Sequence, residues 1–321
     1  MLKPSIAGNG SSANAKQENF TMSASVPLIS VGLPVYNGEG FLAQTLDSIL
    51  SQTLTDFELI ISDNGSVDGS RAIAESYARR DGRVQVVQSD INRGAAWNYK
   101  RVLDLARGPY FRWAPADDLF APESLACCVE VLDQHPEAIL CYPKTTLIDA
   151  HGGTIRPYDD NLDLRQASPV DRYKAVIKQL GLTNVIYGLM RTDVLRQTRL
   201  IGNFPGADLI FVAELSLFGQ FHEIDRPLFF RRMHEGASSS IRSEQGVQAF
   251  MDPQVRRKRR FARRWYHLVE NMRSVLHGPI KTSERVRLLF FLLRAMIASR
   301  DELLNELLLV MKPWGQRVSR L

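Results

Sequence analysis

The sequence predicts an α/β fold, in which a mostly parallel sheet is flanked by helices and followed by a C-terminal α-helical extension. Five apolar runs of strand length alternate with segments whose apolar residues recur at helical spacing. This alternation implies parallel strands joined by crossover helices. Beyond about residue 250 the pattern becomes long, amphipathic and helical. A parallel sheet binds ligands at the carboxyl ends of its strands, so the polar residues there are the first candidates for a site.

The first half of the chain supplies the five expected strands, each bounded by polar turn residues. They are 28–33, 57–62, 83–89, 109–114 and 138–148. A helix is expected in each interval between them. The clearest is 39–51, because Leu42, Leu46 and Ile49 fall on one face of a helix there.

After residue 150 the pattern loosens, and the HGG stretch at 151–153 indicates a hairpin turn. Helices are expected at 168–180 and 207–218, with extended chain at 184–190. The stretch FHEIDRPLFFRR at 221–232 is typical of a strand, a turn and a second strand.

Composition divides the chain into a tail at 1–25, a main domain at 26–248 and a basic helical extension at 249–321. The tail is rich in Ser, Ala, Asn and Gly, which predicts disorder and not a signal peptide. No run of about 18 uncharged apolar residues suggests a spanning helix. Three Cys are too few for a disulfide framework, so we expect a cytoplasmic protein.

A glycine-rich loop follows the first expected strand. Gly38, Gly40 and Ala43 fit the dinucleotide-binding pattern G-x-G-x-x-A, which would indicate an NAD-linked oxidoreductase. However, Pro-Val-Tyr-Asn separates this strand from the glycines, and acidic residues follow the second and fourth strands. Those acids would repel a pyrophosphate unless a hard cation lay between them. The pattern therefore favours a metal-bound nucleotide over a bare dinucleotide.

Three blocks, taken in order, resemble the family 2 inverting glycosyltransferases. They are PVYNGEGFLAQTLDSILSQ, DFELIISDNGSVDGS and NRGAAWNYKRVLDLARGPYFRWAPADDLF. The resemblance covers roughly 27–235 and implies a GT-A fold of the nucleotide-diphospho-sugar transferase type. The domain at 26–248 would then be the GT-A catalytic domain, built on a mostly parallel sheet flanked by helices.

The resemblance places Pro34, Tyr36 and Asn37 along the base and ribose of the donor, where an aromatic ring can stack on the base. It assigns Asp63 to the imide N–H of uracil or thymine, which favours UDP or dTDP. The alternative for Asp63 is an Asx-turn with no ligand contact.

Further donor contacts are expected from the loops after the second and third strands. Ser66 and Asn98 would line the nucleotide, and Arg93 would meet phosphate oxygens unless it is a solvated arginine at the start of a helix. Arg231 and Arg232 are further possible phosphate partners.

The acidic pair after the fourth strand is the strongest signal for chemistry. The family shows Asp-x-Asp-Asp here, whereas this chain has Pro115 in place of the first acid. The resemblance implies that Asp117 faces the donor and that Asp118 ligates Mg²⁺ or Mn²⁺. His234, in the segment RRMHEGASSS, is a second expected metal ligand; otherwise it is an ordinary loop histidine.

Asp208 is the expected catalytic base, since the resembling family carries an acid at the start of this helix. Ala207 replaces the Glu of the usual Glu-Asp pair, and the structural alternative is an acid favoured by the helix dipole. The implied reaction is a metal-assisted single displacement onto a hydroxyl of a glycan or lipid-linked acceptor, in polysaccharide or glycolipid assembly. The alternatives are a non-catalytic nucleotide-sugar-binding protein and the NAD-linked oxidoreductase.

The basic extension allows two interpretations. Residues 253–321 hold 16 Lys and Arg against 5 Asp and Glu, a net charge of +11, while the rest of the chain carries −6. The segment 255–265 interleaves basic residues with Phe261 and Trp265, and apolar stripes follow it. Either these helices cap the catalytic domain, or residues 250–321 contact the anionic inner face of a membrane. Nucleic-acid binding is not expected, because no known module is present.

Overall fold

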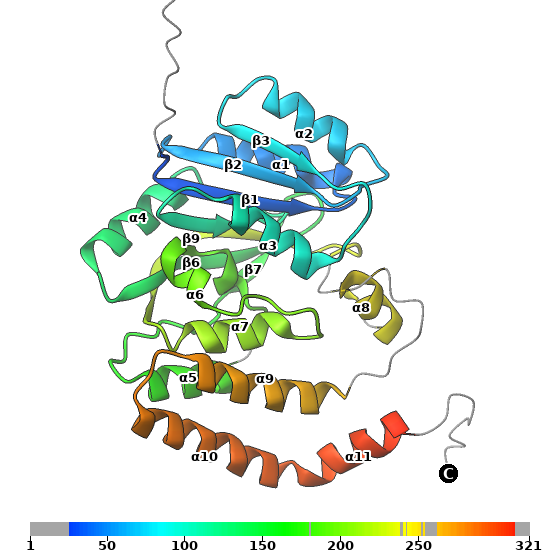
Figure 1. The fold of residues 1–321 in the computed structure, drawn as a ribbon. Helices are drawn as coiled ribbons and strands as arrows, with labels where there is room; N and C mark the ends of the chain where they lie inside the picture. The colour runs from blue at the N-terminus through cyan, green and yellow to red at the C-terminus, as the bar shows by residue number, and fades with distance from the viewer. Residues whose placement is uncertain are drawn as a thin grey trace, which may run out of the picture.

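The computed structural model describes residues 26–179, 181–237, 240–241, 243–251, 253 and 262–311. In this part of the chain a nine-stranded sheet carries helices on both faces, and further helices stack below it (Figure 1). The expected tail at 1–25 and the most basic stretch, 254–261, lie outside the described residues.

The first half of the chain forms alternating strands and helices, as predicted. They are β1 (Ile29–Val35), α1 (Glu39–Leu50), β2 (Phe57–Asp63), α2 (Ser70–Ala78), β3 (Val84–Gln88), α3 (Ala95–Leu105) and β4 (Tyr110–Trp113). The four strands are parallel and lie in the order β3-β2-β1-β4. Their carboxyl ends therefore meet at one edge, where the polar loops gather.

The second half completes the sheet with strands of mixed direction. The elements are β5 (Leu119–Phe120), α4 (Ser124–Gln134), β6 (Ala138–Ile148), β7 (Thr154–Tyr158), α5 (Pro169–Lys178), η1 (Asn184–Tyr187), β8 (Leu189–Arg191), α6 (Thr192–Gln197), α7 (Ala207–Leu215) and β9 (Gln220–Arg232). β6 and β9 pair in parallel, whereas β8, β7 and β5 join antiparallel. The α/β class is confirmed, and the parallel character belongs mainly to the first half.

Two local predictions in the second half are wrong. The stretch expected to be extended at 184–190 begins with the 3₁₀ turn η1, because the Asp160 carboxylate accepts hydrogen bonds from the N–H groups of Asn184 and Val185. The stretch 221–232 is one continuous strand, β9. The residues expected to turn, around Asp225, form an irregularity in its pairing with β6, where Lys144 binds the Asp225 carboxylate at 2.6 Å.

Two hydrophobic cores lie on the two faces of the sheet. One packs α1, α2 and α4 against β1 and β2, around residues such as Leu46, Leu59 and Leu125. The other packs α3, α5 and α7 and extends to Val275 and Leu288 in the C-terminal helices. Alternate residues of the strands supply the two cores, as the pleat of a sheet requires.

The C-terminal helices continue the second core. They are α8 (Glu244–Met251), α9 (Arg263–His277), α10 (Thr282–Ala298) and α11 (Arg300–Met311). Arg199 joins Glu214 of α7 to Glu270 of α9 through ion pairs of 2.8 and 2.7 Å. The domain limit drawn at 248 falls within α8, which lies against the start of α3. Among the described residues, no helix has the length and apolarity needed to cross a bilayer.

Candidate active site

A cavity of about 730 Å³ opens at the carboxyl ends of the strands. The loops after β1, β2 and β4 line it, together with the end of β9 and one side of α8. Its volume falls in the range of cavities that hold small ligands and cofactors. The sheet topology thus places the predicted polar loops around one shared space.

Two acids and a histidine converge at one end of this cavity. The Asp117 carboxylate lies 2.9 Å from Nε2 of His234, and Asp118 is adjacent, with 3% of its surface exposed. Burial, followed by the negative charge of Asp117, raises the pKa of the Asp118 carboxyl well above its ordinary value. Asp117 and His234 are therefore in contact, with Asp118 next to Asp117 in the chain.

Arg232 lines the cavity and holds this arrangement in place. Its backbone N–H donates to the Asp118 carboxylate at 2.7 Å, and its guanidinium donates to the carbonyl oxygens of Asp117 and Ala150 and to the side chain of Gln44. The residue is only 1% exposed. Its guanidinium is thus bound by protein partners, and its contact with phosphate stays a prediction.

Arg231 keeps a position from which it can meet a ligand. It lines the main cavity, while its guanidinium also donates to the Leu182 carbonyl oxygen and to the Asn184 side chain. Of the two adjacent arginines, it is the one whose position agrees with a phosphate contact.

An aromatic ring and several amides also line the cavity. Pro34, Tyr36, Asn37 and Asn98 are among its lining residues. Tyr36 is 47% exposed, so its ring is accessible to a planar ligand. Asn98 donates to the Ser62 carbonyl oxygen at 2.9 Å, while its buried Oδ1 has no partner among the described residues.

Three predicted donor contacts do not line the cavity. Asp63 is 2% exposed and accepts a hydrogen bond from the Ser66 N–H at 3.2 Å, which is the turn-forming alternative for this residue. Ser66 itself accepts from the Asn37 N–H at 2.9 Å. The exposed Arg93 contacts Ser89 and lies over the ring of Trp97. Local partners therefore occupy all three side chains.

Asp208 lines a second cavity of about 360 Å³, which shares Tyr99, Tyr187 and Arg231 with the first. It lies in the first turn of α7. The Thr183 hydroxyl donates to its Oδ2 at 2.8 Å, which fixes its orientation. The predicted base thus faces a chamber that adjoins the one carrying the acids.

A buried acid, Asp160, binds the backbone of the loop that carries Thr183. Asp160 is 5% exposed and accepts from the first N–H groups of η1. Burial raises the pKa of Asp160 to about 6, against the opposing effect of these hydrogen bonds. Thr183 adopts a left-handed φ of 57° at this point. Asp160 therefore positions the residue that orients Asp208.

Several cavity residues had no signal in the sequence. Phe41, Asn64, Asn92, Tyr99 and Tyr187 line the main cavity. The hydroxyl oxygens of Tyr99 and Tyr187, which line both cavities, lie 3.4 Å apart. Asn64 directly follows the predicted residue Asp63, and only this position could have indicated that Asn64 lines the cavity.

The glycine loop does not act as a dinucleotide fingerprint. Gly38 starts α1 and donates its N–H to the Ser70 hydroxyl at 2.8 Å. A Cβ at Gly40 would meet open space, so nothing within the protein requires a glycine there. The loop instead forms one wall of the cavity that holds the acid pair.

A parallel half-sheet, with an acid pair and a histidine beside the carboxyl ends of its strands, agrees with the GT-A fold that the sequence resemblance implied. A family model described as glycosyl transferase family 2 matches residues 30–184. This part of the chain is similar to that family, and the match confirms the resemblance found in the sequence.

Curated relatives are similar over part of their length. The putative teichuronic acid biosynthesis glycosyltransferase TuaG of Bacillus subtilis is 36% identical over 99 residues, which are 31% of this chain and 39% of TuaG. For relatives 35 to 37% identical, the match covers 14 to 40% of the relative's length. The shared part is thus smaller than these whole proteins.

Solved structures show the same fold at low identity. TarS of S. aureus, crystallised with UDP-GlcNAc, is 18% identical with a TM-score of 0.62, over 84% of this chain and 72% of that one. The mannosyltransferase PcManGT of Pyrobaculum calidifontis, in complex with GDP-Man and Mn²⁺, is 16% identical with a TM-score of 0.50, over 87% and 76%. These similarities confirm the GT-A-like fold.

Proposed function

We propose that this protein is an inverting glycosyltransferase that moves a sugar from a nucleoside-diphosphate donor to a hydroxyl acceptor. One observation carries the proposal: Asp117, Asp118 and His234 line a cavity that Tyr36 and several amides also line. The acids and the histidine suit a cation and a diphosphate, and the aromatic ring suits a base.

The residues present fit a hard divalent ion. Asp117 and Asp118 offer carboxylate oxygens and His234 an imidazole nitrogen, a donor set that Mn²⁺ accepts and that Mg²⁺ accepts in part. The Arg232 guanidinium is directed at the Asp117 carbonyl oxygen and the Gln44 side chain and not at the carboxylates. When bound, the ion would offset negative charge on the leaving nucleoside diphosphate.

We assign the proton transfer and the contact with the leaving phosphate to side chains of this protein. The Asp208 carboxylate takes the proton of the acceptor hydroxyl as that oxygen bonds to the anomeric carbon. The carbon–oxygen bond to the diphosphate breaks from the opposite side, so the configuration inverts. Arg231 lines both chambers and meets the departing phosphate. Holding donor and acceptor in adjoining chambers supplies the proximity that such a displacement needs.

The neighbours support a nucleotide-sugar donor and leave the base open. TarS was crystallised with UDP-GlcNAc, and PcManGT with GDP-Man and Mn²⁺. We propose UDP or dTDP as the donor nucleotide, and the UDP-GlcNAc complex of TarS, the neighbour with the higher TM-score, supports the uracil base. The name of TuaG, a putative teichuronic acid biosynthesis enzyme, supports a glycan or lipid-linked acceptor in polysaccharide assembly.

The test is a thermal-shift panel of UDP, dTDP, GDP and NAD, each with and without Mn²⁺, followed by an assay of nucleoside-diphosphate release from matching sugar donors. We expect the melting temperature to rise with UDP or dTDP only when Mn²⁺ is present. Binding without release in the presence of acceptor glycans would identify a non-catalytic binding protein. A shift with NAD alone would contradict the proposal.

We also propose that the outer C-terminal helices contact an anionic membrane surface. α10 exposes Val286, Phe290, Leu293 and Ile297, spaced so that they share one face, and each is 45 to 60% exposed. Arg287 is also exposed on this helix. An apolar face bordered by arginine is typical of helices that lie in the headgroup region.

In a flotation assay, we expect the full chain to rise with vesicles that contain an anionic lipid and to remain in the bottom fraction with neutral vesicles. Replacing Phe290 and Leu293 with Ser should lower the recovered fraction at least fivefold, because two exposed apolar anchors are removed. Ile155→Ser, at another exposed apolar residue on β7, is the matched control. Equal recovery of the double variant and wild type would end the membrane proposal.

A further inference from the structure

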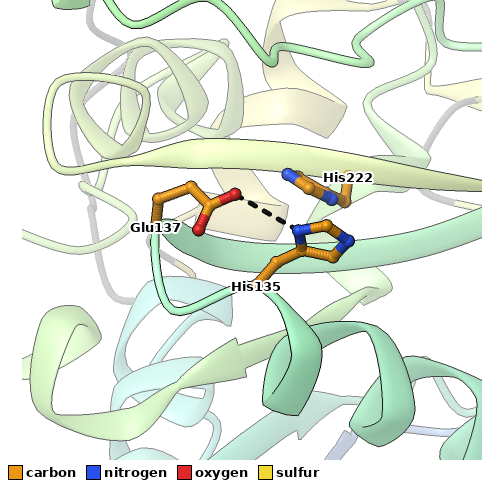
Figure 2. A group of neighbouring side chains, drawn as sticks. All are labelled: His135, Glu137 and His222. Atoms are coloured by element: carbon orange, nitrogen blue, oxygen red, sulfur yellow. Dashed lines mark hydrogen bonds and ion pairs between the residues drawn. The ribbon is translucent and has the colours of Figure 1, made fainter.

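A second group of ligand-type side chains lies at the opposite edge of the sheet from the active site. His135 follows α4, Glu137 immediately precedes β6, and His222 is the third residue of β9 (Figure 2). Because β6 and β9 run in parallel, with Cys141 opposite His222, these residues meet at the amino ends of both strands. Along β9 the group lies roughly 30 Å from the acid pair beside its other end.

The three side chains point toward one another, as Figure 2 shows. One ligand atom from each lies within 4.8 Å of the other two. His135 Nδ1 is 3.2 Å from a Glu137 oxygen, and the two imidazole rings are 4.5 Å apart between centroids. In a tetrahedral zinc site, neighbouring ligand atoms are about 3.4 Å apart, as follows from bond lengths of about 2.1 Å. A contraction of at most about 1.4 Å between ligand atoms therefore suffices.

His222 is the buried member of the group, with 2% of its surface exposed. Its Nε2 lies 3.1 Å from Oε1 of Gln220, so we assign the proton to Nε2. That hydrogen bond leaves the lone pair of Nδ1 for a metal and fixes the ring, as second-shell partners do in zinc sites.

We propose that His135, Glu137 and His222 bind one Zn²⁺ ion, with water in the fourth position. The side chains of His135 and Glu137 are 40% and 50% exposed, so the ion can enter and keep a water ligand. Two imidazoles and one carboxylate suit zinc, whereas Mg²⁺ prefers oxygen donors alone. The ion would fasten the α4–β6 turn to the start of β9, where the pairing of the two strands is irregular.

The test uses the untagged full-length chain, stripped of metal with a chelator. Zn²⁺ is titrated by calorimetry, and Co²⁺ by its visible d–d absorption, which reports a histidine-containing site directly. His135→Ala and Glu137→Gln change partly exposed side chains, so we expect both variants to fold. The controls are His151→Ala, at another exposed histidine, and Asp118→Asn, which removes an expected ligand of the active-site cation.

We expect wild type, His151→Ala and Asp118→Asn to bind Co²⁺ with the same intense spectrum, and Zn²⁺ to raise their melting temperatures. Both site variants should bind Zn²⁺ at least tenfold more weakly and lose the spectrum. Unchanged binding in His135→Ala and Glu137→Gln would overturn the proposal. So would loss of the whole signal in Asp118→Asn, because the ion would then belong to the active site.

Discussion

Asp118→Asn is expected to lower kcat about a thousandfold with little change in stability. The amide keeps an oxygen to accept the Arg232 N–H, so the loop should hold its shape. The variant removes one negative charge from the proposed cation site, and loss of one preorganised electrostatic group costs about 10²–10³ in rate. The measurement is steady-state release of nucleoside diphosphate over a range of Mn²⁺ concentrations.

The variant should also respond differently to metal. Wild type should lose activity with chelator and recover it with Mn²⁺, whereas the variant should stay inactive at any concentration tested. Asp104→Asn is the matched control, because Asp104 lies on the exposed side of α3 in an ion pair with Lys100. If Asp118→Asn turned over at a near-normal rate in the presence of chelator, the metal-assisted scheme would be wrong.

Asp208→Asn is expected to abolish transfer while leaving donor binding intact. Removing a general base costs about 10²–10⁴ in rate, and the amide cannot take the proton of the acceptor hydroxyl. Because Asp208 lines the smaller chamber and not the main cavity, the Kd of the nucleotide should change less than twofold. Calorimetry of nucleotide binding and a single-turnover transfer assay separate the two effects.

Two further variants make this test specific. Thr183→Ser keeps the hydroxyl that orients Asp208 and should retain most of the activity. Asp193→Asn changes an exposed acid in the first turn of α6, and it should behave as wild type. Transfer by Asp208→Asn at more than a tenth of the wild-type rate would remove Asp208 from the role of base.

The first half of the fold could be predicted because its strands are short, mostly apolar segments bounded by turn residues. β2, for example, buries all seven of its residues, and its sequence FELIISD is apolar at four of them. The second half depends on contacts between distant segments. η1 forms because Asp160 reaches across to Asn184, and nothing in the local sequence indicates that contact.

Some residues of the candidate site could likewise be predicted from the sequence, and others could not. Asp117, Asp118 and His234 could be predicted because each follows directly from a strand end that the sequence marks. Arg232 was taken for a phosphate partner since its type alone suggested it, but the fold surrounds it with carbonyl oxygens. The side chains of Tyr99 and Tyr187 reach the cavity through the packing of α3 against η1, which sequence periodicity does not describe.

The hydrogen bond between Arg232 and Asp118 joins residues 114 positions apart, and its consequence concerns biosynthesis. As the chain leaves the ribosome, β1 to β4 are complete long before β9 has been made. Asp117 and Asp118 then remain without their hydrogen bonds to Arg232 until this late segment closes a long loop. A product truncated before β9 would retain every residue that matches the family model, yet it would leave one edge of β6 without its partner and the candidate site without Arg232.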